Sequence, residues 1–162
     1  MTFYPPEITE VDGPVIFLAG PIQGAPNWQE QAINYFKQTA PALHIASPRK
    51  EYITGTFVYA KQVDWETYFL NRASANGVVL FYLANEVEHV AGRAYAQTTR
   101  FELGEWKTKH QWLGTSLVVG IEEGFSNTRY IKRRLSQDCP QVPICSSLVE
   151  TCKAALQLIR EK

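Results

Sequence analysis

The sequence has few of the residues that metal sites and disulfide frameworks need. Its 162 residues include only three histidines and three cysteines, and Cys139, Cys145 and Cys152 stand at spacings that match no zinc pattern. The histidines do not cluster with them in the sequence. We therefore expect no bound metal, no cofactor and reduced thiols.

Net charge and long apolar runs are also absent. Sixteen basic residues balance sixteen acidic ones, which excludes a global electrostatic field that would attract nucleic acid or an anionic membrane surface. No apolar run approaches the roughly 20 residues that span a bilayer, and no charged segment followed by an apolar one opens the chain. We expect a cytoplasmic protein that has neither a nucleic-acid nor a membrane partner.

What the sequence does contain is a regular alternation of short apolar strands and helical segments. With 45% hydrophobic residues, the chain can bury one substantial core, so we expect one domain over residues 1–162. Apolar or β-branched runs predict strands, and 3.6-residue periodicity predicts helices. The strands are expected at 15–19, 43–47, 77–83, 116–121 and 142–145; the helices at 27–40, 59–74, from between 90 and 97 through the segment 98–106, around 128–137, and at 146–162.

This alternation predicts an α/β fold: a doubly wound, flavodoxin- or Rossmann-like sheet of about five parallel strands flanked by helices. Ligands of such folds bind beyond the carboxyl ends of the strands, where the strand order reverses. Side chains that carry chemistry are therefore sought just after Ala19, Ser47, Leu83 and Ile121.

The first candidate is the loop "LAGPIQGAPNW" after the first apolar strand. Gly20 and Gly24 allow the backbone to approach a ligand closely, and Pro21 stiffens the turn. The loop has neither the GxGxxG spacing nor the Gly-Lys-Ser/Thr of a phosphate loop. By itself, "GP" after a strand is also typical of an ordinary turn.

The second candidate is the helix expected at 59–74. Its apolar stripe is centred near Phe69, and Gln62 and Glu66 lie within that stripe, whereas Asp64 lies on the opposite face. Glu66 therefore points toward the sheet or its rim. The alternative to a functional role is a rim carboxylate paired with an arginine such as Arg49.

The third candidate is "TTRFELGEW" at 98–106, where acids stand among aromatic residues. On a helical wheel Glu102 falls between Phe101 and Trp106, and Glu105 lies toward the edge. Glu102 is in the early turns of the expected helix, where the helix dipole favours an ionised carboxylate. Such a group suits a nucleophile, although structural ion pairs also bury acids.

Together these segments resemble the nucleoside 2-deoxyribosyltransferase-like family. The matching motifs are "VIFLAGPI" before a tryptophan-containing helix, "SPR" after the second strand, "QVDWE", and "TTRFELGEW", in this order over about residues 14–130. The resemblance implies a flavodoxin-like fold and a ping-pong exchange of bases between deoxynucleosides and free nucleobases. Glu102 matches the position of the family's nucleophile, which forms a covalent 2-deoxyribosyl intermediate.

The resemblance also assigns substrate contacts. Glu66 falls near a carboxylate that positions or protonates the base, and Gln62 lies one turn before it. Family members are usually homo-oligomers with sites completed across subunits. The loop lining the sugar pocket matches Gly20, Pro21 and Ile22, with Gln23 beside them; Asn85 is a candidate in the loop before the nucleophile, and Asn127 is a candidate for holding the sugar's 5'-hydroxyl from a neighbouring subunit.

Departures from the family pattern leave three hypotheses open. Residues 84–97 contain Asn85, Glu86 and Glu88, without clear correspondence to the aspartate that contacts the base in relatives, and "AGPIQGAPNW" lacks the serine of nucleotide-hydrolysing relatives. The first hypothesis is a 2-deoxyribosyltransferase. The second is a nucleoside or deoxynucleotide N-glycoside hydrolase, and the third is a nucleoside- or nucleotide-binding module without turnover.

Overall fold

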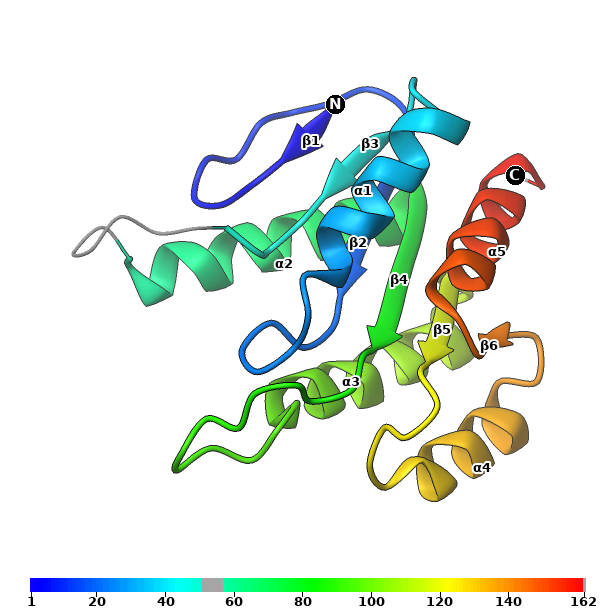
Figure 1. Ribbon diagram of the computed structural model, residues 1–162. Helices are drawn as coiled ribbons and strands as arrows, with labels where there is room; N and C mark the ends of the chain where they lie inside the picture. Colours follow the sequence, from blue (N-terminus) through cyan, green and yellow to red (C-terminus); the bar gives the residue numbers. More distant parts are fainter. Residues whose placement is uncertain (51–56, 162) are drawn as a thin grey trace.

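A six-stranded parallel sheet forms the centre of the computed structural model, which describes residues 1–50 and 57–161 (Figure 1). The strand order is β1-β3-β2-β4-β5-β6, and each neighbouring pair is parallel. The strands are β1 (Thr2–Phe3), β2 (Val15–Ala19), β3 (His44–Ala46), β4 (Gly77–Leu83), β5 (Leu117–Ile121) and β6 (Ile144–Cys145). The helices are α1 (Trp28–Thr39), α2 (Tyr59–Ala75), α3 (Gln97–Leu113), α4 (Thr128–Asp138) and α5 (Leu148–Arg160). The predicted doubly wound α/β fold is confirmed.

The strand that the sequence pattern missed is β1. It pairs with β3 through Thr2 opposite Ile45, and the Ser47 amide donates to the Phe3 carbonyl at 3.0 Å. The Phe3 ring stacks on Phe69, with centroids 5.3 Å apart. Two residues are too short to show a strand's alternation of side chains, so no periodic signal announces β1.

Two layers of helices cover the sheet. Figure 1 shows α1 and α5 on one face and α2 and α3 on the other. Side chains of β2 alternate between the layers: Ile16 and Leu18 pack on the α1/α5 side, and Phe17 on the α2/α3 side. Burial on both faces explains the continuous apolar runs. Within the described residues, no helix is both long and apolar enough to cross a membrane.

The helix ends differ in how clearly the sequence marks them. Asn27 caps α1 by accepting from the Glu30 amide, and Ser147 caps α5 by accepting from the Glu150 amide. In contrast, α3 follows Ala96, which has a left-handed backbone (φ 56°) and makes no side-chain cap. This is why the start of α3 could be predicted only within a range.

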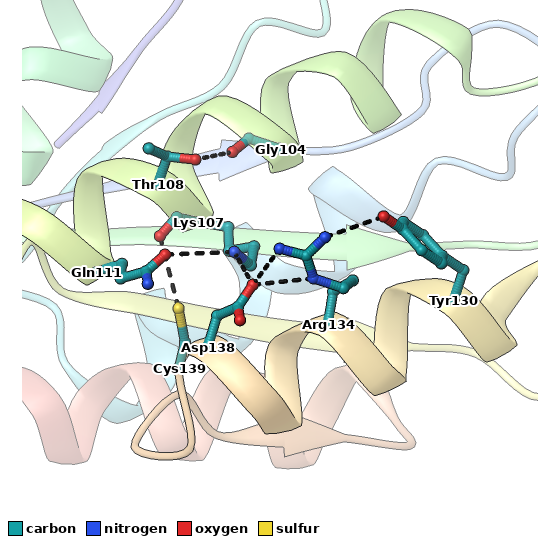
Figure 2. Close-up of polar contacts among 8 residues, drawn as sticks. All are labelled: Gly104, Lys107, Thr108, Gln111, Tyr130, Arg134, Asp138 and Cys139. Carbon is teal, nitrogen blue, oxygen red and sulfur yellow. Dashed lines mark hydrogen bonds and ion pairs between the residues drawn. The ribbon is translucent and has the colours of Figure 1, made fainter.

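A polar cluster fixes α4 against α3 (Figure 2). The Asp138 carboxylate lies 2.5 Å from Lys107 Nζ and 2.6 Å from Arg134 Nη2, and it thereby joins the two helices. The Cys139 thiol donates to the Lys107 carbonyl at 3.6 Å. On α3 itself, the Thr108 hydroxyl donates back to the Gly104 carbonyl. These contacts fix α3 on the side that faces α4.

The packing of α5 on the sheet predicts an effect of Gly120→Ala on stability. A Cβ at Gly120 would lie 2.2 Å from Thr151 Oγ1 and 2.6 Å from Tyr82 Cδ2, so the helix and strand must move apart. We expect the free energy of unfolding in urea to fall by about 1–3 kcal/mol, as in other overpacked cores.

The matched control is Gly104→Ala on α3, where a Cβ meets no atom within 4 Å. There, replacing a helical glycine should raise the free energy of unfolding by about 0.5–1 kcal/mol. Equal effects of the two substitutions would contradict the close contact at Gly120.

Candidate functional site

A cavity of about 470 Å³ lies at the carboxyl ends of β2 and β4. The chain runs from β2 to β3 on one side and then to β4 on the other, so the strand order reverses between β2 and β4. This is the position at which doubly wound folds bind ligands. Its walls come from β2 and the loop after it, α2, the loop before α3, and the first turns of α3. The lining residues are Phe17, Ala19–Gln23, Pro48, Lys50, Phe57, Gln62, Glu66, Glu86, Val90, Arg93–Thr99 and Glu102.

Glu66 of α2 and Glu102 of α3 both line this cavity. The two helices cover the same face of the sheet, and each is anchored there by buried residues one position away, Trp65 in α2 and Leu103 in α3. The anchors turn the adjacent glutamates toward the rim, where the two helices meet the cavity. Trp106 is buried, as its position beside Glu102 on the wheel suggests. Phe101, the other aromatic residue beside Glu102 on the wheel, is instead 76% exposed.

The Glu66 carboxylate is held by an amide donor. Gln62 Nε2 lies 2.6 Å from Glu66 Oε1, one helical turn away, and 3.3 Å from the Pro48 carbonyl. Burial raises the pKa of Glu66, and the hydrogen bond from Gln62 opposes that rise. Arg49 donates instead to the Pro26 carbonyl at 2.7 Å and to Gln29. The alternative interpretation of Glu66 as the ion-pair partner of Arg49 is therefore wrong.

Unlike Glu66, the Glu102 carboxylate has no hydrogen-bond donor among the described residues to offset the free-energy cost of its burial. Within residues 1–50 and 57–161, no hydrogen-bond donor reaches it, and Glu105 is instead paired with Lys109 at 2.7 Å. Burial raises the pKa of Glu102 to about 7, and the charges of Glu66 and Glu105 add to the rise. The expectation of an ionised Glu102 must be corrected, because desolvation outweighs the helix dipole. Near neutral pH the free protein holds Glu102 partly protonated.

The loop after β2 approaches neighbouring chain segments closely. A Cβ at Gly20 would lie 2.4 Å from the Tyr82 carbonyl oxygen and 2.6 Å from Trp28 Cζ2, so only glycine fits. The Pro21 carbonyl accepts from Trp28 Nε1 at 2.9 Å. These contacts fix the backbone while the residues from Gly20 to Gln23 line the cavity.

The loop before α3 meets the loop after β2 across the cavity. Arg93 Nη1 donates to Gln23 Oε1, and the Val87 and Glu88 amides both donate to the Gly24 carbonyl. The Tyr95 hydroxyl donates to the Ala84 carbonyl, and burial raises its pKa to about 12. Sequence reasoning missed Arg93, Tyr95 and Lys50 as lining residues. Only their place in loops beyond strand ends could have indicated them.

Two predicted contact residues lie outside the cavity lining. The Asn85 amide nitrogen Nδ2 donates to the Glu123 carbonyl at 2.6 Å, which turns this side chain toward the loop after β5. Asn127 is exposed and precedes α4 in a left-handed conformation, with φ 54°. The contact expected of Asn127, with a sugar bound by a neighbouring subunit, stays a prediction. The side chains that could bind a metal do not gather in groups of three or more anywhere in the described ranges.

Comparisons with known proteins give no assignment: no protein-family model matches the chain, and no significant match is found among curated proteins. Function must therefore be argued from the cavity and its side chains.

The raised pKa of Glu102 predicts a pH-dependent gain in stability on substitution. Its carboxyl has a pKa near 4.5 when unfolded and about 7 when folded, so the folded state binds more protons between these values and loses stability as pH rises through them. We expect Glu102→Gln to raise the free energy of unfolding by about 2–3 kcal/mol at pH 8 and to have little effect at pH 4.5.

Urea denaturation at the two pH values measures this difference. Glu105→Gln is the matched control on the same helix: Glu105 is exposed and paired with Lys109, and its charge is the smallest contribution to the pKa of Glu102, so this variant should show a much smaller difference between the two pH values. A gain for Glu102→Gln that is equal at both pH values would show that the carboxyl does not titrate as described.

Proposed function

We propose that the protein is a nucleoside 2-deoxyribosyltransferase that exchanges nucleobases between 2'-deoxynucleosides through a glutamyl intermediate on Glu102. One observation carries the proposal: the carboxylates of Glu66 on α2 and Glu102 on α3 line one cavity at the reversal of strand order. Two carboxylates beside one substrate are the groups that retaining N- and O-glycoside chemistry uses. The order of the sequence motifs supports the same chemistry.

In the proposed reaction a Glu102 oxygen bonds to the anomeric carbon as the bond from that carbon to the base nitrogen breaks. The departing base leaves with a proton, and a second base then displaces Glu102 and regenerates the carboxyl. The negative charge of Glu66 favours the cationic character of the sugar in the transition state. The cavity volume lies in the range of small-molecule sites, and Phe17, Pro21 and Ile22 offer apolar walls.

A hydrolase is the second candidate, and one observation favours it. Two cationic side chains, Lys50 and Arg93, line the cavity. Cations at the rim suit a substrate that carries a phosphate. Water would then take the sugar from the intermediate in place of a second base. The third hypothesis, a binding module, is the outcome in which ligand binds without turnover.

Base exchange tests the proposed function directly. With deoxyinosine and free adenine, we expect the protein to form deoxyadenosine and hypoxanthine, measured by chromatography. Glu102→Ala should lower the rate by at least about a thousandfold, because it removes the nucleophile. Glu105→Ala, three residues away on the exposed side of α3, is the control and should retain most of the activity.

Other products would separate the hypotheses. Release of deoxyribose, or of deoxyribose 5-phosphate from a deoxynucleotide, without exchange would favour hydrolysis. Saturable binding without any product would favour the binding module. Full activity of Glu102→Ala would contradict the assignment of the nucleophile.

We also propose that a second copy of the chain binds the outer face of α3. Phe101 and Trp112 are each 76% exposed and lie on one side of the helix. An antiparallel copy, related by a two-fold axis level with residues 106 and 107, brings Phe101 of one chain to Trp112 of the other. The same arrangement sets Glu105 opposite the partner's Lys109, so the face is complementary to itself in charge.

We also propose a cytoplasmic location, where the free thiols stay reduced.

Sedimentation over a range of concentrations tests the α3 face. We expect the wild-type chain to form dimers, and Phe101→Ser with Trp112→Ser to weaken dimerisation at least about tenfold, because aromatic side chains dominate interface energetics. Tyr130→Ser is the control, since Tyr130 is also exposed but lies on α4. A wild-type chain that stays monomeric at high concentration would contradict the proposal.

A further inference from the structure

The two helix-borne carboxylates that line the cavity, Glu66 and Glu102, differ in their hydrogen bonding. Glu66 Oε1 accepts from Gln62 Nε2 at 2.6 Å. No donor reaches the Glu102 carboxylate from any residue that the structure describes. An amide donor stabilises the ionised form of a carboxylate, and burial without a donor stabilises the protonated form. One proton shared by this pair therefore belongs on Glu102.

The other charged groups around the pair are engaged elsewhere. Lys50 Nζ donates to the Pro5 carbonyl at 3.2 Å, and Arg93 donates to Gln23 across the cavity. Glu86 contacts His89 at 3.0 Å. From α3, Glu105 adds a second negative charge near Glu102, although Lys109 pairs with it. Tyr95 stays a neutral phenol, because burial raises its pKa. Among the described residues, none of these contacts reverses the asymmetry that Gln62 creates.

We infer that Gln62 is a positioning residue that keeps Glu66 ionised, so that the proton of the pair resides on Glu102 before substrate binds. This inference rests on the proposed function for its chemical meaning. It differs from the roles that the family resemblance implies, in which the nucleophile is the ion and the second carboxyl brings the proton. It also reassigns Gln62 from substrate contact to the support of Glu66.

The one-proton pair contains what the first half-reaction requires. The proton passes from Glu102 to Glu66 and from Glu66 to a ring nitrogen of the leaving base. The freed Glu102 oxygen bonds to the anomeric carbon while the bond to the base nitrogen breaks. The products are a neutral glutamyl ester, the neutral free base that now carries the proton, and the Glu66 anion, so the total charge of the pair is unchanged. In the second half-reaction the incoming base returns its proton by the same route.

The pH dependence distinguishes this arrangement from the reverse one. A base that leaves only after protonation requires the pair with one proton, so the rate falls when that proton is lost near pH 7. In contrast, nicotinamide leaves its 2'-deoxyriboside as a neutral base without any proton transfer, and this substrate has no group that titrates between pH 5 and 8.5. That substrate requires only the ionised form of Glu102, and its rate rises through the same pH range.

The experiment compares kcat/KM for 2'-deoxyguanosine and nicotinamide 2'-deoxyriboside between pH 5 and 8.5, with spontaneous cleavage subtracted. We expect a fall above pH 7 for the first substrate and a rise toward a plateau for the second. A rate on the nicotinamide substrate that is flat across pH 7 would overturn the inference, because Glu102 would then be ionised from the start.

Gln62→Leu tests the positioning role. The rate on deoxyguanosine should also fall at low pH, where Glu66 takes up a proton, and this fall is the acidic limb of the profile. Without its donor Glu66 binds a proton more readily, so the acidic limb should move to higher pH by about one unit. We expect kcat to fall while KM changes little. Asp64→Asn, on the opposite face of α2, should leave both limbs in place. An unchanged acidic limb in Gln62→Leu would overturn the positioning role.

Infrared spectroscopy of the free protein provides a measurement that does not depend on turnover. The C=O stretch of a protonated carboxyl should disappear near pH 7 in the wild type, and this transition should be absent in Glu102→Gln. If it persists in Glu102→Gln and is lost in Glu66→Gln, the proton resides on Glu66 and the inference is wrong. Should no substrate be cleaved at all, the proposed function fails, while the infrared titration still locates the proton.

Discussion

The parallel pairing of β2 with β4 is the constraint on which the site depends. Five consecutive residue pairs, from Val15 with Gly77 to Ala19 with Phe81, hold the two strands in register, so their carboxyl ends lie side by side. Gly77 makes this start possible, because a Cβ there would lie 1.9 Å from the Val15 carbonyl oxygen. The loops that follow the strands are consequently forced into contact, and the space between them becomes the cavity.

Burial of acid in this cavity opposes stability and favours chemistry. Glu102 gives up hydration without gaining a hydrogen-bond donor from the described chain, and its raised pKa expresses that loss. Glu66 keeps one donor, and the hydrogen bond from Gln62 opposes the rise in its pKa that burial causes. Two carboxyl groups in different surroundings can take different protonation states at one pH, which is how acid and base roles become separated. The surrounding aromatic core, with Trp65 and Trp106 buried, supplies the rigidity that such a pair requires.

Much of the fold could be predicted from the sequence, because its strands are buried on both faces. The boundaries of β2 and β4 agree residue for residue with the apolar runs at 15–19 and 77–83. The wheel also separated Glu66 from Asp64, since helix orientation follows the apolar stripe. It failed at Phe101, because a wheel gives a direction and not the width of the buried face. The helix-dipole argument did not show the raised pKa of Glu102, because desolvation depends on neighbours that are distant in the sequence.

The loops were least accessible to sequence reasoning. Asn85 is one residue beyond the buried Ala84, yet its side chain turns to Glu123, a contact between residues 38 positions apart. No local pattern contains that information. The contact between Arg93 and Gln23 joins residues 70 positions apart for the same reason.

That contact has a kinetic consequence. Gln23 and Arg93 join the two loops by exposed side chains, whereas the Val87 and Glu88 amides hold the backbone to Gly24. Side-chain rotation at an exposed position takes picoseconds to nanoseconds, and loop displacement is slower. A reaction that releases one base and admits another while the sugar stays bound needs passage twice in each cycle. In the proposed base exchange, rotation of Arg93 would open the rim on this fast timescale, with the hydrogen-bonded backbone left in place.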